Sequence, residues 1–145
     1  MSTAPRPDAA AFRGPLAATY QHWYDASQAN PLDPVLRELT AIRTAALNGC
    51  SFCLRMHLAS ARKLGRSQAW MDSIPAWRTS PVFTAKERAI LAWTDAVTVI
   101  TGGHDDDAAY AALAEHATPE EICLITAHIA QNNLWNRIAG PLRWE

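Results

Sequence analysis

Two of the three cysteines in this chain lie three residues apart, in the segment Cys50-Ser-Phe-Cys53, and His57 follows one helical turn later. Glu38 lies twelve residues before the first cysteine. Two thiols at this spacing can form a short-range disulfide, and a histidine and a carboxylate can move the protons that thiol chemistry requires. Close cysteine pairs also occur in metal sites. The segment therefore indicates a redox site first and a metal site second.

A zinc half-site and an inert pair of buried cysteines are the alternatives to redox chemistry. A tetrahedral zinc site takes four ligands, whereas Cys50, Cys53 and His57 offer three at close spacing. The other histidines show no paired spacing with one another; they are His22, His104, His116 and His128. We therefore favour a redox pair over a metal site.

The composition of the chain sets limits on its function class. The 145 residues are 49% apolar and 19% charged, which is typical of one globular domain with a core of its own. A formal net charge of −1 provides no basic field for nucleic acid or for an anionic membrane. The sequence has no apolar run that could span a bilayer and no secretory pattern, so we expect a cytoplasmic protein. Thiols are kept reduced in that compartment, where a close cysteine pair is more often catalytic or metal-binding than structural.

Helical periodicity dominates the chain, and strand-like alternation is nearly absent, so we expect an all-α fold in a single domain over residues 15–145. Residues 1–14 are rich in Pro and Ala and are expected to form a flexible arm. The expected helices cover about 15–27, 34–48, 50–64, 67–73, 84–100, 105–116 and 118–139, each bounded by capping residues or by Gly and Pro. Capping boxes are expected at Thr84–Glu87 and Thr118–Glu121, Ile100 should be buried, and residues 101–104 should form a loop that includes His104.

The helix boundaries determine where the chemical groups lie. Asp33-Pro34 should begin the second helix and Asn48-Gly49 should end it, which places Cys50 and Cys53 in the first turn of the next helix. The orphan amides of a helix N-terminus stabilise a thiolate. His57 lies one turn after Cys53 on the same face and can reach its sulfur or an intervening water. Glu38 has no cation among its helical neighbours, which leaves its carboxylate available for proton transfer.

Three further features have simpler interpretations. Cys123 lies beside Ile122 and Leu124, so we expect it to be a buried small hydrophobe. His128 lies one turn from Asn132, facing either a polar cleft or a subunit contact, and a structural role is the expectation. The six tryptophans follow helical spacing and should anchor the core or an interface.

The spacing of Glu38, Cys50, Cys53 and His57 resembles the signature of the AhpD-like alkylhydroperoxidase family, within the carboxymuconolactone decarboxylase superfamily. The resemblance extends over roughly residues 15–140. It includes Leu36-Arg-Glu-Leu39, Asn48 to His57, SPVFTAKERAILAWTD at 80–95 and Asn133-Leu-Trp-Asn-Arg137. It implies an all-α fold that assembles into trimers or hexamers and uses neither a metal nor an organic cofactor.

The resemblance also implies a function and a role for each residue. The implied activity is the reduction of organic hydroperoxides. Cys53 would be the peroxidatic thiol, Cys50 would resolve its sulfenic acid to a disulfide, and His57 with Glu38 would relay protons. Regeneration would come from a dithiol donor such as a lipoylated protein.

One position departs from the family pattern. Relatives often carry Tyr or His immediately before the second cysteine, and this chain carries Phe52. Two other functions therefore stay open. One is a redox-sensing or structural oligomer without turnover, and the other is a carboxymuconolactone decarboxylase-like lyase, which would not need both thiols.

Overall fold

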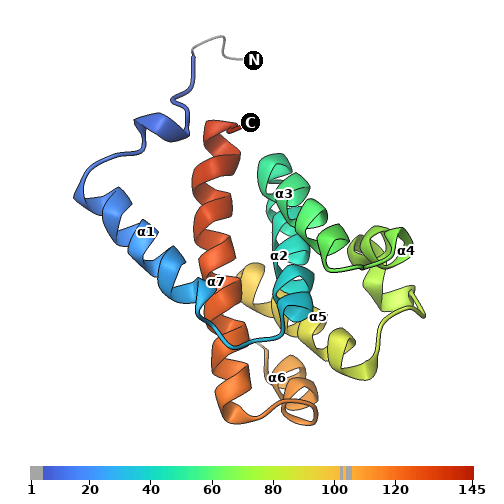
Figure 1. Ribbon diagram of the computed structural model, residues 1–145. Helices are drawn as coiled ribbons and strands as arrows, with labels where there is room; N and C mark the ends of the chain where they lie inside the picture. The colour runs from blue at the N-terminus through green and yellow to red at the C-terminus, as the bar shows by residue number, and fades with distance from the viewer. Residues whose placement is uncertain (1–4, 102, 104–105) are drawn as a thin grey trace.

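The computed structural model describes residues 5–101, 103 and 106–145, and every regular element among them is a helix (Figure 1). Two elements are short 3-10 helices, η1 (Ala9–Ala11) and η2 (Ile74–Thr79). The α-helices are α1 (Pro15–Gln28), α2 (Pro34–Asn48), α3 (Ser51–Lys63), α4 (Gln68–Ser73), α5 (Ala85–Thr98), α6 (Asp107–Ala114) and α7 (Pro119–Leu142). The all-α prediction is confirmed.

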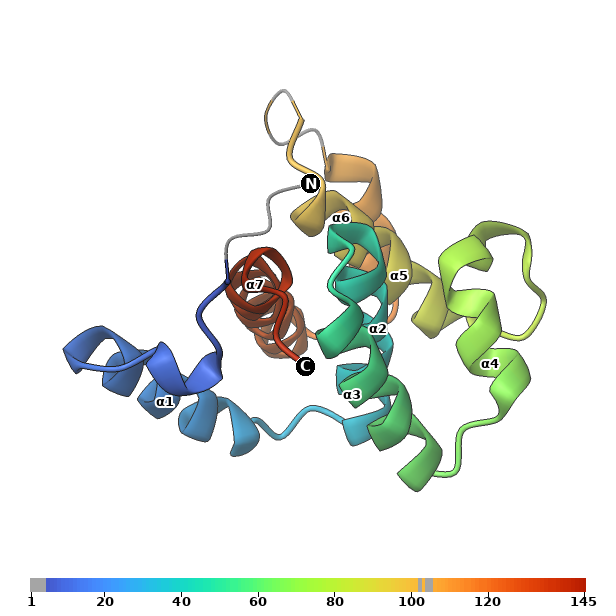
Figure 2. The ribbon, with the colours of Figure 1, turned by 90° about the horizontal axis from the view of Figure 1, so that it is seen from above.

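Helix α2 is the centre of the arrangement, because it packs against α3, α5 and α7 (Figures 1 and 2). Its inner face buries Leu39 and Ile42 completely, and these residues join a core completed by Ile90, Ile125 and other apolar side chains of α5 and α7. Burial of such side chains is the main favourable contribution to folding. The core therefore fixes α2, α3 and α7 relative to one another.

Local capping signals set the helix ends as predicted around the cysteine segment. Asp33 caps α2 by accepting a bond from the Val35 amide at 2.8 Å, and Pro34 occupies the first turn. Gly49 closes α2 with a φ of 67°, a left-handed conformation that glycine adopts without strain. The Thr84–Glu87 capping box at the start of α5 forms both of its bonds.

Three predictions about the later helices are wrong. Cys123 is exposed, because it lies on the outer side of α7 while its neighbour Ile122 faces the core. Ile100 is 54% exposed, because α5 ends at Thr98 and the chain turns away from the core. Thr118 caps α7, but the expected capping box is incomplete. The Glu121 carboxylate does not bond back to the Thr118 amide; it forms an ion pair with Lys86 at 2.7 Å.

Helix α1 lies on the outer side of α7, away from the main core, and none of its residues is fully buried (Figure 2). Leu16, Trp23 and Tyr24 are between 41% and 58% exposed, although their spacing suggests a packed face. The predicted arm at residues 1–14 lies partly outside the described residues. Its described part contains η1 and Phe12, whose ring stacks on Tyr20 of α1 with centroids 5.8 Å apart.

Within the part of the chain that the structure describes, no helix combines the length and apolarity needed to cross a bilayer. The predicted loop residue His104 and the first residue of the sixth predicted helix, Asp105, lie outside the described residues.

Candidate active site

The two cysteines occupy the turn between α2 and α3 and form a disulfide with a Cα–Cα distance of 5.4 Å. Cys50 is the N-cap of α3, and its sulfur accepts a bond from the Cys53 amide at 3.3 Å. This is the placement that the Asn48-Gly49 stop signal predicts. Both residues are buried, with 1% and 3% of their surface exposed. The sulfurs are thus shielded from bulk water at the positive end of a helix.

A network of amide side chains fixes this turn against α7. The Asn48 side chain, at the end of α2, donates to Asn133 Oδ1 at 3.0 Å and to Asn136 Oδ1 at 3.2 Å. Asn133 in turn donates to Thr98 Oγ1 of α5 at 3.1 Å and accepts a bond from Arg137. Because Asn133 and Asn136 are buried and Asn48 is bonded to both, this network holds the cysteine turn at a fixed position along α7.

Helix α7 covers one of the two cysteines. Both cysteines belong to a buried apolar cluster with Ala139, and Gly140 presents its backbone to the Cys50 side chain. Cys53 instead lines a cavity between α1, α2, α3 and α7. The fold therefore gives the two sulfurs different surroundings, with Cys53 beside open space and Cys50 enclosed by protein.

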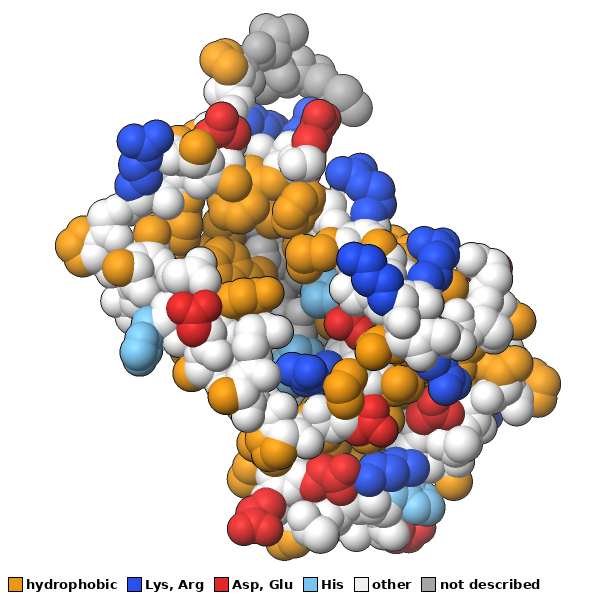
Figure 3. Space-filling view, in the orientation of Figure 1, with side chains coloured by type: hydrophobic (Ala, Val, Ile, Leu, Met, Phe, Trp, Pro, Cys, Tyr) orange, Lys and Arg blue, Asp and Glu red, His pale blue; other side chains and the backbone are white. Residues whose placement is uncertain are grey.

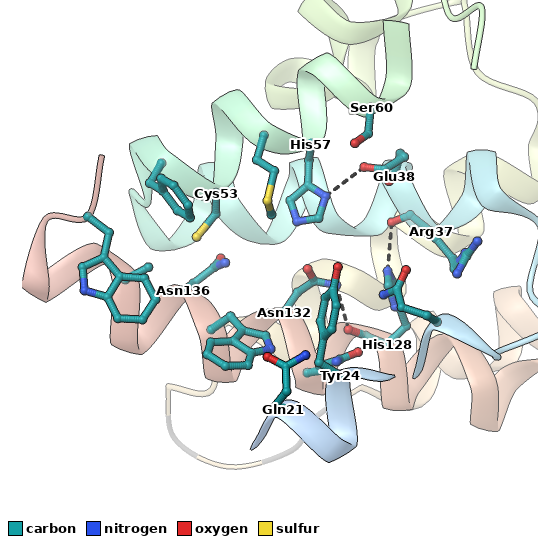
Figure 4. Close-up of a pocket in the computed structure, with 17 residues that line it drawn as sticks. Gln21, Tyr24, Arg37, Glu38, Cys53, His57, Ser60, His128, Asn132 and Asn136 are labelled. Atoms are coloured by element: carbon teal, nitrogen blue, oxygen red, sulfur yellow. Dashed lines mark hydrogen bonds and ion pairs between the residues drawn. The ribbon is translucent and has the colours of Figure 1, made fainter. Parts of the chain in front are cut away.

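The structure brings Glu38 of α2 to His57 of α3, with 2.8 Å between a carboxylate oxygen and the Nδ1 atom. Their side chains are 18% and 15% exposed, respectively. An ionised carboxylate only accepts hydrogen bonds, so Nδ1 carries the proton and donates it. The other ring nitrogen then points into the cavity on the side of Cys53 (Figure 4). The sequence-predicted residues Cys53, His57 and Glu38 all line this cavity.

The cavity has a volume of about 350 Å³, the lower end of the range for small-molecule sites. Figure 3 shows a hollow whose upper part is lined by hydrophobic side chains and whose lower part exposes histidine, acidic and basic side chains. The residues that line the cavity are Gln21, Tyr24, Gln28, Arg37, Glu38, Phe52, Cys53, Met56, His57, Ser60, His128, Gln131, Asn132, Trp135, Asn136, Ala139 and Trp144.

Phe52 belongs to an aromatic wall at the cysteine end of the cavity. Its ring meets Trp144 edge-on at 6.4 Å, and Phe12 meets both Trp144 and Trp135 edge-on at 6.2 and 6.3 Å. Edge-to-face pairs of this kind are favourable beyond the area that they bury. The position that often carries a polar group in relatives thus contributes an apolar surface beside Cys53.

His128 lies in the same cavity, opposite the His57–Glu38 pair, so the polar-cleft alternative matches its position. The residue is 8% exposed, and its Nε2 atom lies 3.2 Å from the Arg37 carbonyl oxygen, to which it donates. Burial lowers the pKa of His128 from 6.5 to about 4, and the charges of His57 and Arg37 act in the same direction. His128 is therefore neutral at neutral pH, with Nδ1 as an acceptor.

Sequence reasoning missed the polar side chains that α7 contributes to the cavity. Gln131, Asn132 and Asn136 line it together with His128, and they lie three, four and eight residues after His128. Such intervals place residues on one face of a helix, so a polar stripe at this spacing was the available signal. Among the described residues, no group of three or more His, Cys, Asp or Glu side chains is arranged to hold a metal ion.

The sequence pattern that defines the carboxymuconolactone decarboxylase family matches residues 15–96, which include Glu38, both cysteines of the site and His57. The chain belongs to this family. A crystal structure from Agrobacterium tumefaciens superposes with a TM-score of 0.91 at 36% identity, over 97% of this chain and 96% of that one. That protein is of unknown function and is described as a candidate antioxidant defence protein AhpD.

Two curated relatives are uncharacterised proteins. YdfG of Bacillus subtilis is 34% identical over 71% of this chain and 70% of its own length. YnjA of Escherichia coli is 32% identical over 88% of this chain and 69% of its own length. Together with the Agrobacterium structure, the family match confirms the AhpD-like resemblance and the fold.

The low pKa of His128 predicts how stability depends on pH. Between pH 6.5 and about 4, the unfolded chain binds a proton at this residue that the folded chain does not bind. The free energy of unfolding should therefore fall as the pH falls through this window, by about 3 kcal/mol in total, and this contribution should level off below pH 4.

The measurement is urea unfolding followed by circular dichroism at several pH values. His128→Gln should remove this part of the pH dependence, whereas the exposed control His116→Gln should keep it. An unchanged pH dependence in His128→Gln would show that His128 titrates alike in both states.

Proposed function

We propose that this protein is a thiol-dependent peroxidase that reduces organic hydroperoxides through the Cys50–Cys53 pair. The observation that carries the proposal is that one sulfur of the pair and the His57–Glu38 hydrogen bond line the same cavity. Family membership and the likeness to a candidate antioxidant defence protein agree with this activity. The disulfide in the structure corresponds to the oxidised end of the cycle.

The first step of the proposed cycle forms a sulfenic acid. His57 takes the thiol proton of Cys53, and the thiolate attacks the outer oxygen of the hydroperoxide. The S–O bond forms as the O–O bond breaks, and the leaving alkoxide receives the proton back from His57 to become an alcohol. Glu38 stabilises the charged imidazolium by accepting the Nδ1 hydrogen bond. Cys53 is assigned this role because it, and not Cys50, lines the cavity.

The second step forms the disulfide. The Cys50 thiolate attacks the Cys53 sulfur, and hydroxide leaves and is protonated to water. The net reaction converts the hydroperoxide and two thiols into an alcohol, water and one disulfide. A dithiol donor, for which a lipoylated protein is a suitable class, then restores both thiols by exchange and is itself oxidised to a disulfide. Because this cycle needs reducing conditions, we propose a cytoplasmic location.

Cysteine substitutions test the assignment of the two thiols. Reduced wild-type protein treated with cumene hydroperoxide should lose two thiols per chain from the pair, as measured with a thiol reagent. Cys53→Ser should abolish peroxide consumption, and Cys50→Ser should consume one equivalent and stop at a trapped sulfenic acid. Cys123→Ser is the matched control and should retain turnover, because Cys123 is exposed and lies outside the cavity.

Two outcomes would contradict the peroxidase function and favour another function. Disulfide formation without turnover by any dithiol donor would favour a redox sensor. Full activity of Cys50→Ser/Cys53→Ser on a small lactone acid would favour a lyase.

Substitution of the carboxylate tests the proton relay. In Glu38→Gln the imidazolium of His57 loses its anionic partner, so the rate constant for Cys53 oxidation should fall by about 10²-fold. The rate is followed by thiol loss over a range of pH, and the pH at which the rate reaches half its maximum should shift as well. The exposed control Glu115→Gln should react like the wild type. Equal rates in both variants would exclude Glu38 from the relay.

We also propose that the chain works as a homo-oligomer, a trimer or a hexamer. Large apolar side chains are exposed on the single chain: Leu16, Trp23, Val99, Ile100 and Tyr110. Exposed apolar surface of this extent commonly marks contacts between chains. Sedimentation velocity should give the mass of a trimer or hexamer for the wild type and a smaller mass for Trp23→Glu or Ile100→Glu. A monomeric wild type would refute the proposal.

A further inference from the structure

Six buried side-chain nitrogen atoms in the described residues have no hydrogen-bond partner within the chain, and five of them belong to residues that line the cavity beside Cys53. The five are Arg37 Nε, His128 Nδ1, Gln131 Nε2, Asn136 Nδ2 and Trp144 Nε1. Unpaired buried polar atoms cost free energy and are rare in native proteins. Their concentration in residues around one cavity makes the wall of this cavity rich in polar N–H groups.

The chemistry of these atoms defines the ligand. Four of the five are N–H donors, so the cavity wall favours a ligand that carries acceptor oxygens. Arg37 is a cation with no ion pair to any described carboxylate, since the neighbouring Glu38 is bonded to His57. A guanidinium is suited to bind a carboxylate through two parallel hydrogen bonds. The polar end of the cavity therefore calls for a ligand with a carboxylate.

The position of Arg37 gives the length of the ligand. Its carbonyl oxygen is bonded to His128, whereas the cysteine pair packs against Ala139. These two α7 residues are eleven positions apart, which corresponds to about 16 Å along a helix. Figure 4 shows Cys53 and Arg37 at opposite ends of the row of cavity residues. A ligand that spans them must be extended.

The surface near the thiol selects an apolar body. Phe52, Met56, Trp135 and Trp144 line the cavity toward the cysteine end. Hydrophobic side chains likewise gather in the upper part of the hollow in Figure 3. The cavity is therefore polar at one end and apolar at the other, which matches an amphiphilic molecule.

We propose that the substrate is an extended organic hydroperoxide that also carries a carboxylate, such as a fatty acid hydroperoxide, with its carboxylate on Arg37 and its O–O bond at Cys53. The proposal rests on the peroxidase function and specifies its substrate class. The apolar chain lies along α7, and the reaction is the balanced one given above, with a hydroxy acid as the alcohol product.

The first test compares linoleic acid 13-hydroperoxide with its methyl ester, both below their micellar concentrations. The wild type should oxidise its thiols with a kcat/KM at least about 10-fold higher for the acid, because a charge-assisted pair of hydrogen bonds forms only with the acid. Arg37→Met should reduce this ratio to about one, because the ester forms no charge-assisted hydrogen bonds with residue 37 in either protein. Arg37→Lys should keep part of the preference.

Arg55→Met is the matched control, since Arg55 is exposed on α3 and does not line this cavity. It should keep the full preference for the acid. Equal rates for acid and ester in the wild type, or a preference that survives Arg37→Met, would overturn the proposal.

A second measurement separates this inference from the peroxidase function. Binding of linoleic acid and of its methyl ester is followed by quenching of tryptophan fluorescence, since Trp135 and Trp144 line the cavity. If linoleic acid binds only when Arg37 is present, but neither hydroperoxide oxidises the thiols, the peroxidase function is refuted and the role of Arg37 as carboxylate anchor is kept. Turnover of cumene hydroperoxide without Arg37-dependent binding of the acid would retain the peroxidase function and refute the anchor.

Discussion

The contact between the Asn48 side chain and α7 determines the geometry of the cysteine site. Asn48 is the last residue of α2, and its amide donates to both Asn133 and Asn136. The next residue, Gly49, reverses the chain, and the residue after that begins the cap of α3. A buried, bonded amide network is a rigid support, so the turn with both cysteines lies at one fixed level of α7. The position of the turn along α7 determines which sulfur α7 covers and which sulfur borders the cavity.

The fixed turn between α2 and α3 also positions the Glu38–His57 pair. Because α2 and α3 pack against each other on either side of one turn, side chains on their facing sides can meet. Glu38 and His57 meet in this way, with their hydrogen bond at 2.8 Å. The thiol, the imidazole and the carboxylate therefore lie in order along the cavity, and a cation follows at Arg37 (Figure 4). The proton transfer and the ligand anchoring that we propose would share one row of side chains.

The neighbours of Phe52 in the folded chain explain what its side chain does. At the sequence level it is a missing polar group beside the second cysteine. In the folded chain it packs edge-on against Trp144 and lines the apolar end of the cavity. A phenyl ring cannot take part in proton transfer, so the relay that we propose rests on His57 and Glu38 alone. The substitution exchanges a polar contact for an apolar surface, which is consistent with an amphiphilic substrate.

The sequence by itself determined the helix boundaries and the cysteine turn, because capping and left-handed closure depend on nearest neighbours. Asp33, Gly49 and Thr84 act within four residues of their own positions and were predictable. The sequence also placed His57 one helical turn beyond Cys53 and indicated the AhpD-like family.

Only the tertiary structure decided which faces are covered, since burial depends on elements distant in the chain. It exposed Cys123 and Ile100, left α1 without a buried residue, and gathered Arg37, His128 and Gln131 around one cavity. Those side chains come from α2 and α7, more than eighty residues apart, and no local pattern specifies how two such helices pack.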